Sequence, residues 1–171
     1  MSADQNKYSF AVLTLSDKGS RGEREDTSGA YIKEKLNAGG YRLLAYNIIP
    51  DQKQVIIDAL LDLTDRQKID LVITTGGTGV SPTDITPEAM MEVVEREIPG
   101  MAEAMRAASM LITPRAMLSR GKAGIRGESL IINLPGSLKA ARENLDVVLP
   151  VLNHALEKIK GGTGDCGQHP L

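Results

Sequence analysis

Small, polar and acidic residues come directly after the apolar segments of this sequence. Carboxylates are oxygen ligands of the kind that Mg²⁺ prefers, and glycines let backbone amides approach a phosphate closely. The combination suits an anionic ligand held together with a divalent cation. The residues concerned are Ser16, Asp17, Asp51, Gly76, Gly77, Thr78, Gly79, Asp84, Pro135, Gly136 and Ser137.

The glycine run Gly76–Gly79 has two interpretations. It permits positive φ angles and can present N–H groups to a phosphate, with the Thr78 hydroxyl as a further donor. It can equally be a tight turn between a strand and a helix, with no ligand. It is neither a P-loop nor a GxGxxG dinucleotide fingerprint, because the required spacing is absent.

Asp51 and Asp84 are the candidate metal ligands, and both also have a structural interpretation. Asp51 lies between Pro50 and a predicted helix, so local sequence alone favours an N-cap. For Asp84, the alternative is a turn former or a solvated loop acid. Ser16 and Asp17 are either substrate-binding residues or part of an Asx-type turn, and local sequence favours the turn.

The candidate residues must be positioned by alternating strands and helices. Residues 16–26 are expected to form a loop, Thr86 to cap a helix with Pro87 at its first position, and 114–128 to form a short irregular strand or hairpin. Strands are predicted over 8–15, 41–49, 69–74 and 129–134; helices are predicted from 26–28 to 39–40, over 52–66, from 86, over 101–111, and over 138–160 with a break or restart at Pro150.

This alternation predicts a three-layer α/β/α domain with a mostly parallel central sheet. The carboxyl ends of parallel strands share one edge, and ligands bind in the crevice outside that edge. Segments that are distant in sequence are therefore expected to converge on one cleft.

Composition limits the remaining possibilities. The 171 residues predict a single domain over 1–171, with a core over about 8–160 and a mobile tail over 161–171. No signal peptide or membrane span is apparent, and a single cysteine fits a cytoplasmic protein without an internal disulfide. A net charge of −2 and 3% aromatic residues argue against a nucleic-acid partner.

Other polar and sulfur-containing residues each leave two interpretations open. The basic residues either neutralise phosphate charge or are solvated: Lys18, Arg21, Arg24, Arg120, Lys122 and Arg126. His154 is expected on a helix, at the surface or partly buried, and Cys166 with His169 is a weak metal-binding signal. The methionines on predicted helices, among them Met90, Met91, Met101, Met105 and Met110, are expected in the core or at subunit contacts.

The run 71–79, followed after four residues by Asp84, resembles the signature of the MoaB/Mog family of molybdenum-cofactor biosynthesis. The wider match spans roughly residues 8–160 in the expected order. It includes residues 11–17, 48–51, 84–89, 116–120, 123–127 and 130–137. The tail after residue 160 is not part of the shared core.

The resemblance implies a three-layer α/β domain that assembles as a trimer, or as a hexamer in some members. It implies binding of molybdopterin, which active members adenylylate with ATP and Mg²⁺. Carried over by position, Asp51 and Asp84 are the catalytic and metal-binding acids. The cleft residues carried over are Ser16, Asp17, Gly76, Gly77, Thr78, Gly79, Ser109, Pro135, Gly136 and Ser137.

Three functions follow as hypotheses. The first is a molybdopterin adenylyltransferase, which the presence of both acids favours. The second is a molybdopterin-binding paralogue that acts as a carrier or scaffold without catalysis. The third is a nucleotide-dependent redox enzyme, against which the missing dinucleotide fingerprint argues.

Overall fold

The computed structural model describes residues 8–163, in which six strands form one sheet in the order β2-β1-β3-β6-β5-β4. Strands β1 (Ser9–Leu15), β2 (Arg42–Ile49), β3 (Leu71–Thr75) and β6 (Ser129–Leu134) are parallel to one another. β5 (Ala123–Arg126) runs antiparallel to β6, and the short β4 (Arg96–Glu97) pairs with β5. The mostly parallel sheet is therefore confirmed. Of the two expectations for 114–128, the short strand beside the sheet is present as β5, and its hairpin partner β6 lies beyond that segment.

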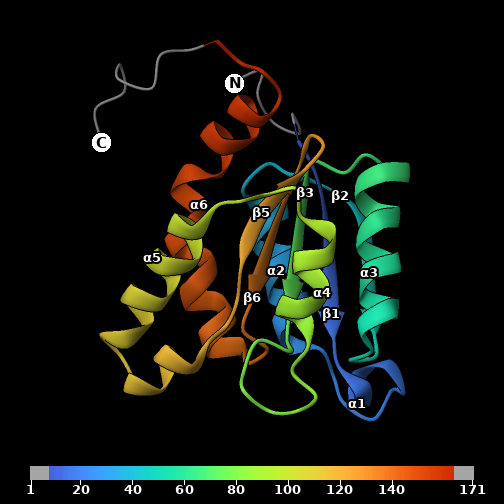
Figure 1. The fold of residues 1–171 in the computed structure, drawn as a ribbon, viewed down its shortest axis with the longest axis vertical. Coiled ribbons are helices and arrows are strands. Elements are labelled where there is room, and N and C mark those ends of the chain that lie inside the picture. The colour runs from blue at the N-terminus through green and yellow to red at the C-terminus, as the bar shows by residue number, and fades with distance from the viewer. Residues whose placement is uncertain (1–7, 164–171) are drawn as a thin grey trace.

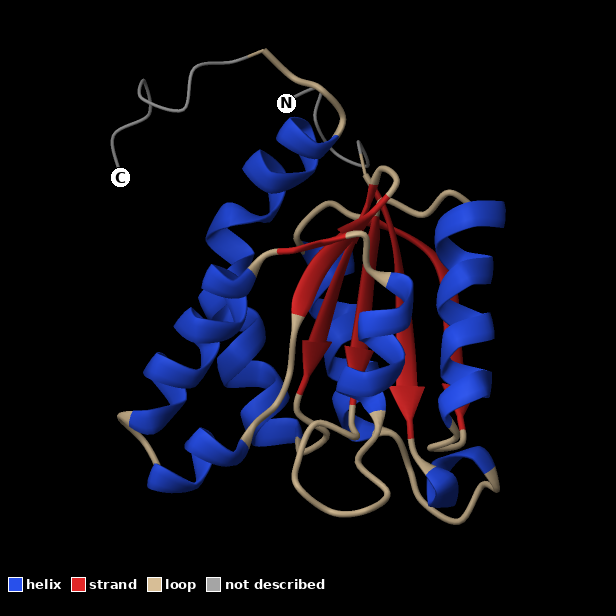
Figure 2. Cartoon of the chain, viewed as in Figure 1, coloured by secondary structure: helices blue, strands red, loops and turns tan. Residues whose placement is uncertain are grey.

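Helices cover both faces of this sheet (Figures 1 and 2). One face carries α2 (Thr27–Ala38), α5 (Pro99–Met110) and α6 (Leu138–Ile159), and the other carries α3 (Lys53–Leu61) and α4 (Thr86–Val93). Alternate residues of β1 point to opposite faces, as expected for a strand buried on both sides. Phe10 packs in the core on the α2 and α6 side, whereas Leu13 packs on the α3 and α4 side. The expected three-layer α/β/α arrangement is confirmed.

The strand registers align the carboxyl ends of the four parallel strands at one edge. Leu15 is paired with Ile49, Thr14 with Thr75, and Thr75 with Leu134. The loops that follow β1, β3 and β6 lie together at the lower end of the view in Figure 1. This edge is where the candidate residues were expected.

Several local predictions were wrong. Helix α6 continues through Pro150 without a break; the proline removes one hydrogen bond, but buried Leu145, Val148 and Leu152 keep the helix packed on the sheet. The segment 16–26 contains a short helix, α1 (Asp17–Ser20), instead of loop alone. The helix predicted over 52–66, by contrast, is confirmed in extent, and its last part differs only in being π-helical: it is α-helical over Lys53–Leu61 and π-helical over Asp62–Arg66.

Thr86 is the first residue of α4 and does not cap it. The N-cap position belongs to Ile85, which makes no side-chain cap bond, and Pro87 lies in the first turn as predicted. The Thr86 hydroxyl instead donates to the Gly76 carbonyl at 3.0 Å. Within residues 8–163, none of the helices has the length and apolarity that crossing a membrane requires.

Candidate functional site

A cavity of about 400 Å³ opens at the carboxyl edge of the sheet. Segments after β1, β2, β3 and β6 line it, together with the start of α2, so the expected convergence is present in the structure. Of the predicted site residues, it is lined by Ser16, Asp51, Gly76, Gly77, Asp84, Gly136 and Ser137.

Asp51 faces this cavity and is held by the backbone after β1. Its Oδ2 accepts a hydrogen bond from the Asp17 N–H at 3.0 Å, and its own N–H donates to Asp17 Oδ1 at 3.0 Å. The N-cap interpretation of Asp51 is wrong, because Gln52 occupies the cap position of α3 and makes no side-chain cap bond. Asp17 itself does not line the cavity and acts by fixing Asp51.

Burial raises the pKa of the Asp51 carboxyl above its ordinary value. The Asp17 N–H partly opposes this effect, whereas the negative charges of Asp17 and Asp84 raise the pKa further. The influence of Asp84 on Asp51 shows that the two candidate acids share one electrostatic environment.

Asp84 lies in the loop between β3 and α4. Its Oδ2 accepts from the Ser81 N–H at 2.9 Å, and its own N–H donates to the Ser81 carbonyl at 2.9 Å, so the predicted turn is present. The turn does not remove Asp84 from the cavity, since the residue also lines it. Asp51 Oδ1 and Asp84 Oδ1 make no hydrogen bond to any residue in the described range.

The glycine run forms a turn that only glycine fits at two positions. Gly76 has φ +110° and Gly77 has φ +64°, values that side chains rarely adopt. A Cβ on Gly77 would lie 2.2 Å from Thr86 Oγ1 and 3.3 Å from Asp51 Oδ1. The turn therefore brings bare backbone against Asp51.

The remaining predicted cleft residues, apart from Asp17, lie in a neighbouring cavity of about 280 Å³. Thr78, Gly79, Ser109 and Pro135 line it, together with residues of η2 (Pro114–Leu118), a 3₁₀ helix, and the first turns of α6. Ser109 Oγ accepts a hydrogen bond from Asn144 Nδ2 at 3.0 Å. All the predicted residues except Asp17 thus line one of two cavities. Residues of the glycine loop and of the segment after β6 contribute to both.

Ser16 and Ser137 both line the first cavity and also cap helices. Ser16 Oγ accepts from the Gly19 N–H at 3.0 Å at the start of α1, which confirms the turn interpretation of this residue. Ser137 Oγ accepts from the Ala140 N–H at 3.3 Å at the start of α6.

Sequence reasoning missed one wall of the cavity, which is built around Asp26. Asp26 caps α2 as expected, with Oδ1 accepting from the Gly29 N–H at 2.8 Å. Its Oδ2 also accepts from Thr14 Oγ1 at 2.5 Å and from the Tyr46 hydroxyl at 2.6 Å. Burial and the bond to Asp26 raise the pKa of Tyr46. Because α2 follows β1 in the sequence, its N-terminus is expected near the carboxyl edge of the sheet. This rule could have placed Asp26 at the cavity from the sequence.

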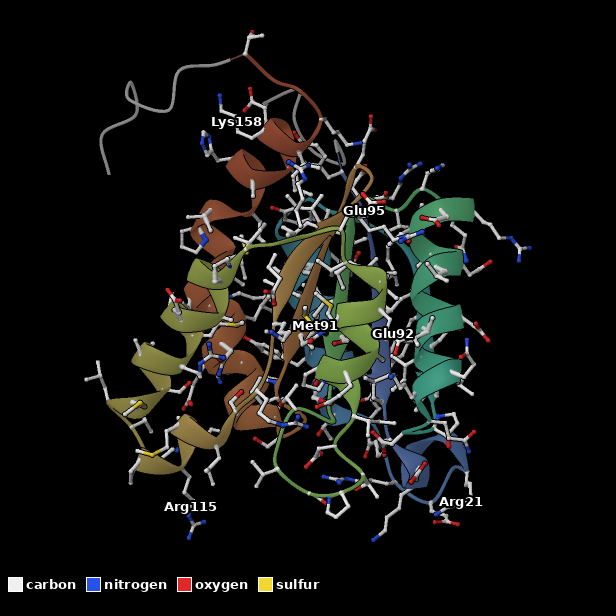
Figure 3. All side chains as sticks on the ribbon, viewed as in Figure 1. Arg21, Met91, Glu92, Glu95, Arg115 and Lys158 are labelled. Carbon is white, nitrogen blue, oxygen red and sulfur yellow. The ribbon has the colours of Figure 1, made fainter. Side chains whose placement is uncertain are left out.

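The basic residues proposed for phosphate binding have different roles in the structure. Arg24 alone among the six lines the 400 Å³ cavity within the described residues. Arg21 pairs with Glu23 at the outer end of the α1 segment (Figure 3). The other ion pairs join Arg120 to Glu88, Lys122 to Glu97 and Arg126 to Asp65.

The other candidates are placed as follows. His154 is exposed on α6, as expected. Met90, Met101 and Met105 are buried, whereas Met91 on α4 (Figure 3) and Met110 are both about half exposed. Cys166 and His169 lie outside the described residues.

The charge of the cavity limits what can bind there. Four carboxylates, those of Glu25, Asp26, Asp51 and Asp84, and the guanidinium of Arg24 line it. An anionic ligand would be repelled unless a divalent cation accompanied it. No cluster of three or more possible metal-binding side chains occurs in the part of the chain that the structure describes. Two carboxylates fit Mg²⁺ that arrives with phosphate ligands, since Mg²⁺ commonly binds through one or two protein carboxylates and substrate phosphates.

Comparison with known proteins identifies the family. Residues 11–154 match the family model described as the probable molybdopterin binding domain. The chain belongs to this family. The resemblance to MoaB/Mog proteins noted in the sequence is thereby confirmed.

Several bacterial proteins with similar sequences are named molybdopterin adenylyltransferase. The molybdopterin adenylyltransferase of Helicobacter pylori strain J99 is 44% identical over 154 residues, which cover 89% of this chain and 88% of that protein. The enzyme of the same name from Escherichia coli K12 is 37% identical over 145 residues, or 84% of this chain and 74% of that protein. The crystal structure of the molybdopterin biosynthesis enzyme MoaB from Thermus thermophilus aligns with a TM-score of 0.85 and 51% identity, covering 90% of this chain and 97% of that chain.

Proposed function

We propose that this protein is a molybdopterin adenylyltransferase, which transfers AMP from Mg·ATP to the terminal phosphate of molybdopterin and releases pyrophosphate. One observation carries the proposal: Asp51 and Asp84 line the same cavity, each with a carboxylate oxygen that makes no hydrogen bond to the described residues. The adenylyltransferase names of relatives at 44% and 37% identity support it.

The chemistry requires two anions to meet. An oxygen of the molybdopterin phosphate attacks the α-phosphorus of ATP, the bond from that phosphorus to the bridging oxygen breaks, and pyrophosphate leaves. Such a transfer depends mainly on alignment and on charge neutralisation. Mg²⁺ bound with ATP would stabilise the charge on the leaving pyrophosphate.

Different residues of this chain would align the substrates and neutralise their charge. Asp51 and Asp84 would hold Mg·ATP through their uncommitted oxygens, and Asp17 would keep Asp51 in place. The backbone amide of Gly77 would contact one phosphate without adding charge. The Gly76 N–H is not available for this, because it donates to the Leu134 carbonyl at 3.0 Å. The Asp26 carboxylate accepts four hydrogen bonds and serves to hold the cavity wall in shape.

The exposed apolar residues at the end of α5 and in η2 support an oligomer. Five large apolar side chains are exposed there, and contiguous exposed apolar surface marks protein–protein contacts. They are Met110, Leu111, Ile112, Met117 and Leu118, with exposed fractions of 46%, 91%, 52%, 59% and 51%. We infer that copies of the chain associate in the cytoplasm, and the resemblance to MoaB/Mog proteins implies a trimer or, alternatively, a hexamer. The molar mass in solution tests the assembly.

The test of function is product analysis. Purified protein is incubated with molybdopterin, ATP and Mg²⁺, and the pterin is analysed by mass spectrometry while pyrophosphate is measured. The proposal requires a pterin heavier by one AMP unit, formed together with pyrophosphate and only when Mg²⁺ is present. Tight binding of molybdopterin without either product would instead support the carrier hypothesis.

A further inference from the structure

Arg120 contacts the loop that carries Asp84 at several separate points. Its Nε donates to the Gly79 carbonyl at 2.7 Å, and its Nη2 donates to the Asp84 carbonyl. The guanidinium also pairs with the Glu88 carboxylate in the first turn of α4. In addition, the Arg120 N–H donates to the Thr78 carbonyl at 2.8 Å. One residue thus holds both ends of the segment 78–88.

The side chain of Arg120 approaches this segment from outside the candidate active site. Arg120 and Glu88 line a separate cavity of about 680 Å³ that also contacts α4 and α5. Neither residue lines the 400 Å³ cavity that contains Asp51 and Asp84. The guanidinium therefore contacts backbone carbonyls of the loop, whereas Asp84 itself lines the 400 Å³ cavity.

The hydrogen bonds of Arg120 argue against a direct role with phosphate. A guanidinium has five N–H donors in a rigid planar arrangement, and here they are directed at two carbonyls and one carboxylate. Glu88 also neutralises much of its charge, and the pairing holds the pKa of Glu88 below its ordinary value. Arg120 therefore fixes the position of the loop that carries Asp84.

We propose that Arg120 is a positioning residue, which clamps the Gly79–Glu88 segment so that Asp84 is correctly placed for Mg·ATP. The proposal rests on the adenylyltransferase function proposed above. The available space is small: a Cβ on Gly79 would lie 2.7 Å from Asp84 Oδ2, so a shift of the loop displaces the carboxylate directly. A misplacement of about 1 Å in a catalytic group can lower a rate about 100-fold.

The chain contains a matched control for this clamp in Arg126. Its guanidinium binds the Asp65 carboxylate at 2.8 and 2.7 Å and the Val93 carbonyl at 2.9 Å. Val93 is the last residue of α4, whereas Glu88 lies in its first turn. Arg120 and Arg126 therefore make comparable contacts at opposite ends of one helix, and only Arg120 is next to the candidate site.

The experiment compares Arg120→Ala, Arg120→Lys and Arg126→Ala with the wild type. Hydrogen–deuterium exchange of residues 78–86 is measured without substrates, and kcat and KM are measured for molybdopterin-dependent pyrophosphate release. We expect Arg120→Ala to speed exchange in this segment and to lower kcat by roughly 10- to 100-fold, with the KM for molybdopterin changed less than about threefold. Lysine, a point charge that cannot form the planar contacts, should not rescue kcat.

Arg126→Ala should leave both the exchange of 78–86 and kcat unchanged. The proposal is contradicted if Arg120→Ala behaves like Arg126→Ala, because Arg120 would then contribute only to general stability. It is also contradicted if Arg120→Lys retains the wild-type kcat, because Arg120 would then act through its charge. A wild-type protein that releases no pyrophosphate would refute the proposed function. In that case, the hydrogen–deuterium exchange of residues 78–86 and the affinity for Mg·ATP would still test the role of Arg120. The proposal requires both quantities to change in Arg120→Ala and neither to change in Arg126→Ala.

Discussion

Asp17 and Asp51 each accept a hydrogen bond from the other's backbone N–H, both at 3.0 Å. The pair joins the end of β1 to the end of β2 across 34 residues of sequence. It holds one carboxylate at the cavity while a second negative charge stays close by. Asp51 is therefore well positioned but electrostatically unfavourable, which is typical of a functional acid.

Because the buried negative charge of Asp51 is unfavourable in the folded state, we expect Asp51→Asn to stabilise the protein and to remove its activity. The folded pKa of Asp51 lies above its value of 3.8 in the unfolded chain, mainly because of burial. Its contribution to stability is therefore complete below about pH 3.8 and is lost as the pH rises through the raised pKa. The amide oxygen of the substituted side chain could still accept from the Asp17 N–H, so the variant should melt at a higher temperature than wild type at pH 7.

Thermal melts at pH 4 and pH 7 check this expectation. The gain from Asp51→Asn should shrink at the lower pH. Asp58→Asn, a change at an exposed acid on α3, is the control and should give little gain at either pH. A lower melting temperature for Asp51→Asn at pH 7 would show that the buried charge is compensated in the fold.

Asp84→Asn should abolish most turnover without unfolding the protein. The asparagine oxygen can still accept from the Ser81 N–H, so the loop is retained, but the charge that would hold Mg²⁺ is lost. Loss of one such electrostatic contact lowers kcat by about 100- to 1,000-fold. Steady-state pyrophosphate release and circular dichroism measure the two effects, and near-normal turnover would remove Asp84 from the mechanism.

Gly77→Ala should be more damaging than an equivalent change at another positive φ. Its Cβ would lie 2.2 Å from Thr86 Oγ1, which holds the Gly76 carbonyl, so the strained turn must also move. Gly22→Ala is the control, since Gly22 has φ +72° but nothing within 4 Å of the added Cβ. Gly22→Ala should lower the free energy of unfolding by about 1–2 kcal/mol, the steric penalty of the left-handed conformation alone.

Denaturant unfolding and turnover should separate the two glycine variants. Gly77→Ala should lose more stability than Gly22→Ala and most of its activity. Equal losses in both variants would mean that the glycine loop adjusts freely around the added methyl group.

Asp70→Asn should reduce stability without changing activity. Asp70 Oδ1 contacts Lys160 Nζ at 2.6 Å, and Oδ2 accepts from the N–H and hydroxyl of Ser9, at the end of the sheet away from the site. Burial raises the pKa of Asp70, but the bonds from Lys160 and Ser9 outweigh it and hold the pKa below 3.8. The stabilisation is present above that pH and is lost as the pH falls through the lowered pKa.

Chemical denaturation at pH 7 should show a loss of about 1–3 kcal/mol for Asp70→Asn. Glu128→Gln, which removes a more exposed partner of Lys160 at 3.6 Å, should change stability by less than about 1 kcal/mol. Equal effects from the two variants, or a fall in kcat for Asp70→Asn, would contradict this assignment.

The features that the sequence predicts correctly are those that depend on local patterns of apolar and turn-forming residues. Buried strands, helix ends and the sharing of one sheet edge follow from apolar runs and turn residues. These features place Asp51, Gly77 and Asp84 together. The parts that were missed depend on contacts between distant residues. The Asp51 carboxylate is taken up by Asp17 instead of capping a helix, and α6 passes through Pro150 because its buried face packs on the sheet.

The side-chain partners of Arg120 and Asp26 could not be read from sequence either. Arg120 lies 41 residues from Gly79, and its choice between phosphate and backbone carbonyls depends on where the hairpin places it. Asp26 shows only its helix cap in the sequence, whereas Thr14 and Tyr46 come to it from two strands.

A double-mutant cycle tests the central claim that Asp51 and Asp84 act together on one Mg·ATP. Molybdopterin-dependent pyrophosphate release is measured for wild type, Asp51→Asn, Asp84→Asn and the double variant. When two residues act as a unit, the free-energy losses of their single variants are not additive. The double variant should therefore be only slightly less active than the less active of the two single variants. Losses in kcat/KM that multiply, or activity that survives in either single variant, would show that the two carboxylates do not serve one nucleotide complex.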